Sequence, residues 1–198
     1  MVMKYFGKWE GTGIQVQDPG LKDYINLRPM MVPRMAGRNV AVRFWKTKYT
    51  VIERLMNKLM IPGHKSKKHF ISSGRCGGKG LTAVTIVMKT FNLIEQKTKK
   101  NPVAVLVQAI ENAAPREEIT TIEYGGAKYP QAVDAAPQRR IDVALRYMVQ
   151  GSYQKSYGKK VKAHEALADE IIRASTSDGK SFAISKKLEL ERQADAAR

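Results

Sequence analysis

Cysteine, acidic residues and long apolar runs are scarce in this sequence, and each shortage excludes a class of protein. The single cysteine, Cys76, has no second cysteine for an internal disulfide and no histidine at the spacing of a zinc site. The sequence has no run of about 18 apolar residues, so it predicts no membrane-spanning helix. Residues 1–8 lead into no apolar stretch of the kind found in signal peptides. We therefore expect a soluble, intracellular protein with a reduced thiol.

The shortage of acids leaves a large positive charge, most of it in one quarter of the chain. The 35 lysines and arginines outnumber the 18 acids, which gives a formal net charge of +17. Between residues 34 and 79 there are twelve basic residues and one acid, Glu53, so this segment alone carries +11. A surface that is only solvated usually mixes both signs. The segment therefore predicts contact with a polyanion, and nucleic acid is the first candidate.

Glycine and proline recur through the first 47 residues, and no hydrophobic period is sustained there. We predict an irregular N-terminal extension that becomes ordered on a partner. Aromatic residues alternate with charged ones at residues 5–9 and 43–46. Such aromatics can stack on bases or pack into RNA grooves, or they can fold back onto the core. The sequence leaves both alternatives open.

Residues 48–198 show the 3.6-residue period of amphipathic helices in six places. Asn101 and Pro102 are typical of an N-cap and a first helical position. The basic, glycine-rich loop between the first two helices lacks the fixed spacing of a nucleotide-binding Walker loop. Short connections favour antiparallel neighbours, so we predict a mainly α, six-helix bundle-like domain. The helices are expected at about residues 49–61, 80–98, 102–114, 137–148, 163–172 and 181–198.

A different period interrupts the helices at about residues 118–134. Two β-rich runs, 119–124 and 127–133, flank Gly125 and Gly126. Both positions of a tight hairpin turn can require a positive φ, which glycine adopts without steric cost. Two strands alone are marginally stable in water. We therefore predict a protruding two-stranded β-ribbon that leans on helices or on a partner.

No arrangement of residues indicates catalysis, a metal ion or a cofactor. His64 and His69 lie in the basic loop without the carboxylates or cysteine pair of a metal site, so contact with phosphate or a base explains them better. Cys76 has basic neighbours, but nothing positions a histidine as its base. An RNA-modifying enzyme would need an acid-base set or a cofactor loop that the sequence lacks. We predict a binding protein rather than an enzyme.

Five segments spread over residues 48–198 carry a family resemblance. They are VIERLMNKLM at 51–60, NPVAVLVQAIENAAP at 101–115, YGGAKY at 124–129, PQRRIDVALR at 137–146 and ALADEII at 166–172. Together with the order of the elements, they resemble the universal small-subunit ribosomal protein S-seven family. DPGL at 18–21 and YINL at 24–27 are similar to the archaeal and eukaryotic branch of that family.

The resemblance implies a structural component of the small ribosomal subunit, which works in the cytoplasm as part of the ribosome. It implies a primary binder of the 3′ major domain of small-subunit rRNA that nucleates assembly of the subunit head. Exit-site tRNA, the mRNA path and neighbouring head and platform ribosomal proteins would lie close by. No cofactor is implied.

Basic residues from two sources are predicted to bind rRNA. The charge-rich segment supplies Arg34, Arg38, Arg43, Lys46, Lys48, Arg75 and Lys79. The resemblance implies further contacts at Lys65, Lys67, Lys68, Arg139, Arg140, Lys159, Lys160 and Lys162. The ribbon's first strand lacks the arginines of bacterial relatives, so Tyr124, Lys128 and Tyr129 are predicted to contact either RNA or protein.

The alternative is a DNA-binding helical protein that inserts a pair of helices into the major groove. The positive charge of such a protein gathers along one recognition helix. Here the charge is spread over loops, the extension and several helix starts. Recognition of a folded RNA by its shape is therefore favoured.

Overall fold

The computed structural model of the chain describes residues 3–30, 37, 41–63 and 76–198. Six long helices and a two-stranded ribbon confirm the predicted mainly helical fold, and a one-turn helix in the extension is added to it. The elements are α1 (Pro19–Lys22), the 3-10 helix η2 (Trp45–Lys48), α2 (Val51–Leu59), α3 (Gly80–Thr98), α4 (Pro102–Ala113), β1 (Glu117–Tyr124), β2 (Ala127–Asp134), α5 (Pro137–Ser156), α6 (Ala163–Ser175) and α7 (Phe182–Asp195).

Side-chain caps set the starts of several helices. The Asn101 carboxamide accepts a hydrogen bond from Val103 N at 3.0 Å, and Pro102 occupies the first helical position, as predicted. Thr50 caps α2 by accepting from Glu53 N at 3.2 Å. Such caps satisfy backbone N–H groups that a helix leaves unpaired at its N-terminus. The capped start of α2 follows η2 directly, which places the two elements together beside α5.

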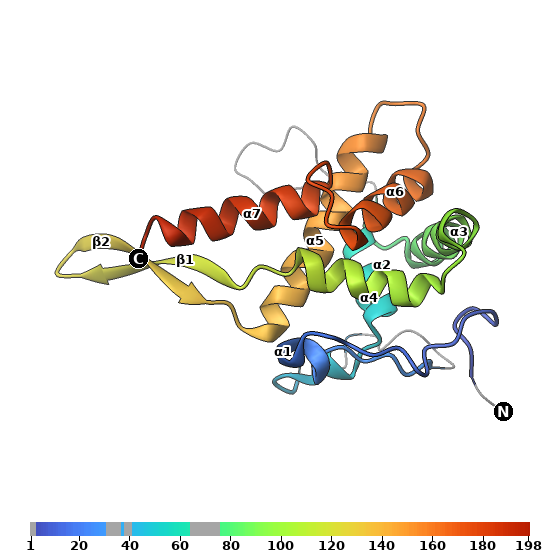
Figure 1. The fold of residues 1–198 in the computed structure, drawn as a ribbon, viewed down its shortest axis with the longest axis horizontal. Helices are drawn as coiled ribbons and strands as arrows, with labels where there is room; N and C mark the ends of the chain where they lie inside the picture. Colours follow the sequence, from blue (N-terminus) through green and yellow to red (C-terminus); the bar gives the residue numbers. More distant parts are fainter. Residues whose placement is uncertain (1–2, 31–36, 38–40, 64–75) are drawn as a thin grey trace.

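The core lies between the helices, with α6 packed against α3, α4 and α5 (Figure 1). The apolar side of α6 packs against the apolar sides of these three helices, as its 3.6-residue period predicts. The largest completely buried side chains include Phe91, Leu106, Ile110, Leu145, Met148, Leu167 and Ile171. None of the described helices is both long enough and apolar enough to cross a membrane.

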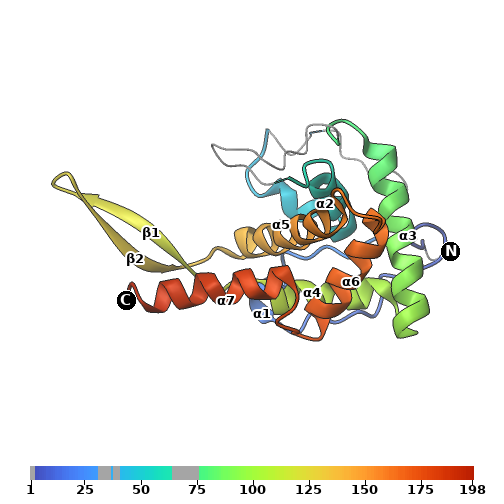
Figure 2. The ribbon, with the colours of Figure 1, turned by 90° about the horizontal axis from the view of Figure 1, so that it is seen from above.

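The β-ribbon projects from one end of the helical body, with α7 running beside its base (Figures 1 and 2). β1 and β2 are antiparallel, and Gly125 and Gly126 form the turn with φ of 57° and 83°. These positive values are the reason why two glycines stand there. At the base, Arg139 of α5 contacts both carboxylate oxygens of Glu118 at 2.6 Å. Arg198 contacts those of Glu117 at 2.5 and 2.6 Å, so each strand-end carboxylate is tied to the helical body.

The first part of the extension folds back onto the helices. Tyr5 and Trp9 are buried, and the Trp9 ring meets the Phe91 ring edge-on with centroids 5.6 Å apart. Trp9 Nε1 donates to Glu95 at 3.1 Å. Of the two alternatives for the extension's aromatics, packing on the core therefore holds for these two residues.

Helices α5, α6 and α7 meet at a buried carboxylate, that of Glu170, which is 0% exposed. It accepts hydrogen bonds from Ser181 Oγ at 2.7 Å and from Ala183 N at 3.1 Å, and it pairs with Lys155. Gly151 permits this close approach, because a Cβ there would lie 2.6 Å from Phe182 Cβ. Glu170 thus joins the three helices through one satisfied buried charge.

Replacing this carboxylate tests its structural role. Glu170→Ala leaves Lys155 and two hydrogen-bond donors without their partner, so we expect the free energy of unfolding to fall by about 3–5 kcal/mol. Urea denaturation followed by circular dichroism measures the change. The control is Glu189→Ala, which breaks an exposed pair with Lys186 and should cost less than about 1 kcal/mol. Equal losses for the two variants would contradict the role assigned to Glu170.

Candidate nucleic-acid interface

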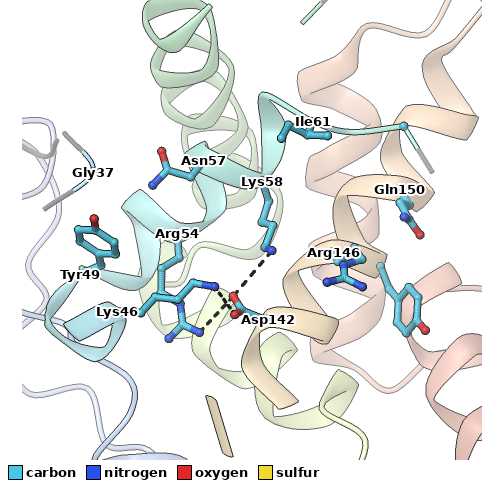
Figure 3. A pocket seen from close by; sticks show the side chains of 12 residues that line it. Gly37, Lys46, Tyr49, Arg54, Asn57, Lys58, Ile61, Asp142, Arg146 and Gln150 are labelled. Carbon is cyan, nitrogen blue, oxygen red and sulfur yellow. Dashed lines mark hydrogen bonds and ion pairs between the residues drawn. The ribbon is translucent and has the colours of Figure 1, made fainter. Parts of the chain in front are cut away.

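A basic groove lies between the middle of α5 and the η2–α2 segment (Figure 3). Its cavity has a volume of about 580 Å³. Among the described residues that line it, the cations outnumber the single carboxylate by three. The charged residues are Lys46, Arg54, Lys58, Asp142 and Arg146.

Asp142 is the centre of this charge cluster. Lys46 Nζ binds its Oδ2, Arg54 Nη2 lies 3.3 Å from its Oδ1, and Lys58 Nζ lies 3.9 Å from the same oxygen. One carboxylate cannot neutralise three cations and a nearby fourth, Arg146. The groove therefore keeps a positive potential that favours an anion.

The pKa values of Lys58 and Asp142 reflect this excess of positive charge. Burial lowers the pKa of Lys58, Asp142 offsets part of that effect, and the charges of Lys46, Arg146 and Arg54 lower it further. Burial alone would raise the pKa of Asp142, but the hydrogen bond from Lys46 and the charges of Arg54 and Lys58 outweigh it, and the pKa falls below its ordinary value. A phosphate near Lys58 would relieve the repulsion among the cations.

Arg54 connects the groove to the extension. Its side chain is only 1% exposed. Besides Asp142, its guanidinium donates to Tyr24 O at 3.3 Å and to Gln138 O at 3.4 Å. Arg54 therefore serves as a buried support, while Lys46 and Lys58 are its more accessible neighbours. The groove is built jointly by the extension, α2 and α5.

A second group of cations is exposed in the segments that precede α6 and α3. Lys159, Lys160 and Lys162 are exposed between α5 and α6, and Lys79 is exposed just before α3. The lysines before α6 oppose its dipole. Glu165 in the first turn offsets part of that effect, with its carboxylate accepting from Lys162 N at 3.3 Å. The structure thus shows these side chains at the surface, and their contact with phosphates stays a prediction.

The adjacent arginines at the start of α5 have different surroundings. Arg140 is 9% exposed and donates to Asp18 at 2.7 Å and to Pro115 O at 3.1 Å. Arg139 stays exposed but holds Glu118 at the base of the ribbon. Both side chains therefore have structural partners within the chain. A shared phosphate-binding role for the pair has less support than the sequence suggested.

The remaining predicted residues divide into exposed ones and ones outside the described part of the chain. Arg43 and Lys48 are exposed around η2, and Lys48 Nζ lies 4.4 Å from the centre of the Trp45 ring. On the ribbon, Tyr124, Lys128 and Tyr129 are exposed, and Lys128 pairs in register with Glu123. The predictions for Arg34, Arg38, Lys65, Lys67, Lys68 and Arg75, and for His64 and His69, concern residues that the structure does not describe.

Three groove residues were missing from the predicted site: Arg54, Lys58 and Arg146. Their signal in the sequence is the spacing of four between Arg54 and Lys58 and between Asp142 and Arg146, which places each pair on one side of its helix. The sequence does not show that these two sides meet. Within residues 3–30, 37, 41–63 and 76–198, no group of three or more His, Cys, Asp or Glu side chains is placed to hold a metal ion.

The sequence of the chain is similar to those of known proteins. The family model described as "Ribosomal protein S7p/S5e" matches residues 22–198. A curated relative from Nanoarchaeum equitans, "Small ribosomal subunit protein uS7", is 53% identical over 198 residues, which is 100% of both chains. A protein of the same name from Archaeoglobus fulgidus is 44% identical over 193 residues, covering 98% of this chain and 94% of its own length.

The family match and these relatives place the chain in a class of ribosomal structural proteins rather than among enzymes. More specifically, the chain belongs to the ribosomal protein S7p/S5e family, and the two relatives named above are archaeal. The resemblance noted in the sequence is thereby confirmed, and these archaeal relatives fit the archaeal and eukaryotic branch that residues 18–27 suggested. The match begins within the extension, at residue 22.

The lowered pKa of Asp142 predicts a pH-dependent contribution to stability. A carboxyl group whose pKa is lower when folded contributes stability above its unfolded pKa of about 4, and this contribution disappears as the pH falls through the folded pKa. Asp142→Asn should therefore lower the free energy of unfolding by about 3 kcal/mol at pH 7. Its difference from the unaltered protein should shrink below about pH 4.

Urea denaturation at a series of pH values measures this difference. Asp169→Asn, in an exposed pair with Lys97, is the control and should cost less than about 1 kcal/mol at any pH. A difference for Asp142→Asn that stays constant from pH 7 to pH 3 would refute the prediction.

Proposed function

We propose that this protein is an rRNA-binding structural component of the small ribosomal subunit. The observation that carries the proposal is the groove in which Lys46, Arg54, Lys58 and Arg146 surround a single carboxylate. A fixed surplus of positive charge in a concave site suits a phosphate backbone. The names of the two archaeal relatives, which place those proteins in the small ribosomal subunit, support the same assignment.

The mechanism is scaffolding. Exposed lysines and arginines neutralise phosphates and release counterions, while the helical core keeps them in a pattern that matches one folded RNA. The direct contacts proposed are Arg43, Lys46, Lys48, Lys58, Lys79, Arg146, Lys159, Lys160 and Lys162. Arg54 and Arg140 act from inside by holding the groove and the extension in place.

The family suggests which region of the rRNA is bound and what the binding does. We propose that the RNA is the 3′ major domain of small-subunit rRNA and that binding nucleates assembly of the subunit head in the cytoplasm. Exit-site tRNA, the mRNA path and other head and platform proteins would be neighbours. The ribbon would contact RNA or a neighbouring protein away from the helical body. It projects from that body (Figure 2), and its Tyr124 and Tyr129 side chains are exposed.

A DNA-binding role is the competing possibility, and a direct comparison separates the two. A DNA-binding helical protein would place its cations along one recognition helix. Here cations line a groove between two helices, and others are exposed in several loops and helices rather than along one helix. Affinities for a folded transcript of the 3′ major domain and for duplex DNA of equal charge should favour the transcript strongly. Equal or tighter binding of the duplex would favour DNA.

Salt dependence tests the phosphate contacts. The affinity for the transcript, measured by filter binding between low and high salt, should fall steeply as salt rises. Replacing Lys159, Lys160 and Lys162 together by Gln should reduce the slope of log affinity against log salt by about 2–3, since each lost phosphate contact removes about one. The exposed loop in which they lie carries no core packing, so folding should be unaffected.

The matched control removes the same charge elsewhere. Lys97, Lys100 and Lys180 are also exposed and lie outside the groove and the loop before α6. Replacing these three by Gln should leave the slope almost unchanged. An equal loss of slope in both triple variants would mean that only the net charge matters, and a slope of zero in the unaltered protein would overturn the proposed function.

A further inference from the structure

Phe44 is an exposed aromatic residue in an unusual backbone conformation. Its ring is 73% exposed, and its φ of 60° lies in the left-handed region that side chains other than glycine rarely adopt. Thr47 fixes this conformation, because its N and Oγ1 donate to Phe44 O at 3.0 and 2.9 Å. A strained residue held in place by its surroundings often marks a binding site. Here the strain keeps a large apolar ring in water.

A cavity of about 370 Å³ lies against this turn and is lined by residues 41–46 and Gln138. Its size is near the lower end of the range of about 300–1,000 Å³ that is usual for ligand sites. The Gln138 side chain has both a donor, Nε2, and an acceptor, Oε1, that are shielded from water without a hydrogen-bond partner. Trp45 Nε1 is also shielded from water without a hydrogen-bond partner. Unsatisfied buried polar groups are rare in folded proteins and call for a ligand or another explanation.

The surroundings of the cavity are positively charged and continuous with the basic groove. Lys46 lines both the cavity and the groove. Arg43 and Lys48 are exposed on the same turn and 3-10 helix. An RNA strand whose phosphates follow the groove would therefore pass beside Phe44 with its bases within reach. An apolar protein side chain would gain nothing from these charges and would leave the Gln138 amide unpaired.

We propose that this cavity holds one unpaired base of the rRNA, with Phe44 as its stacking surface and the Gln138 carboxamide as its hydrogen-bonding partner. The proposal rests on the rRNA-binding function and adds a base-specific contact to it. Stacking of bases on aromatic rings is the general mode for unpaired RNA. The Gln138 amide is shielded in the free protein, so the proposal requires its side chain to turn toward the cavity when the base binds.

Adenine is a base that can satisfy both groups of the Gln138 amide, and it is the base assigned to this site. A glutamine amide can donate to adenine N7 and accept from the adenine N6 amino group at the same time. Both functions of Gln138 would then be satisfied by one ligand. The exposed ring supplies affinity, and the amide supplies the choice of base.

Variants of Phe44 test the stacking contact. In the full-length protein, Phe44→Leu should bind the transcript of the 3′ major domain about tenfold more weakly with an unchanged salt slope, because stacking is lost and no phosphate contact changes. Phe44→Tyr should bind like the unaltered protein. The control, Leu188→Ala, removes another exposed apolar side chain, on α7, and should have no effect. Equal binding by the Leu and Tyr variants would overturn the proposal.

The salt series separates this inference from the function on which it depends. Steep salt dependence in the unaltered protein with no effect of Phe44→Leu would reject the base site alone. Weak binding without salt dependence in every variant would reject the rRNA-binding function as well.

The identity of the base is tested by crosslinking. Ultraviolet crosslinking of the complex followed by mass spectrometry should attach an adenosine to Phe44, and Phe44→Leu should abolish that product. Substituting 7-deazaadenosine at the crosslinked position should weaken binding to the unaltered protein but not to Gln138→Met, because only the former can donate to N7. A crosslink to another base, or equal weakening in both proteins, would contradict the adenine assignment.

Discussion

The burial of the Arg54 guanidinium is the interaction on which the basic groove depends. A charge cannot be removed from water unless it is paired and hydrogen-bonded. Both terminal nitrogens of Arg54 find partners in Asp142 of α5, Tyr24 O of the extension and Gln138 O at the start of α5, while its Nε is buried without a hydrogen-bond partner among the described residues. Three segments that are distant in the sequence must therefore meet at one side chain. Their meeting brings Lys46 and Lys58 to the same carboxylate and leaves the groove with unbalanced positive charge.

Charges of opposite sign are also concentrated in different parts of the molecule. Residues 117–134 of the ribbon contain four acids and one lysine in a chain with a net charge of +17. Arg139 and Arg198 bind two of those acids at the ribbon's base. The acids thus help to anchor the ribbon, and the unpaired cations remain on the helical body. A ribbon of this composition differs physically from a basic finger that inserts into RNA.

Much of the fold could be predicted from the sequence, because each long helix has its own apolar period and several have their own cap. The pairs Asn101–Pro102 and Gly125–Gly126 mark a helix start and a tight turn by local chemistry alone. The short helix α1 was missed, since Pro19 and Gly20 also suit an irregular turn. Arg139 and Arg140 were treated as one basic pair, yet adjacent residues on a helix point about 100° apart. One therefore lies at the surface and the other inward.

The sequence by itself determined the positions of the helices, the ribbon and the surplus of positive charge, because periodicity, caps and turn residues act over a few neighbouring positions. Only the tertiary structure decided which cations stay free for a partner. That outcome depends on contacts between distant residues, such as Arg54 with Asp142, 88 positions apart, and Arg140 with Asp18, 122 positions apart. The positive charge left for RNA depends on how many cations share each carboxylate, and the packing of distant segments settles that number.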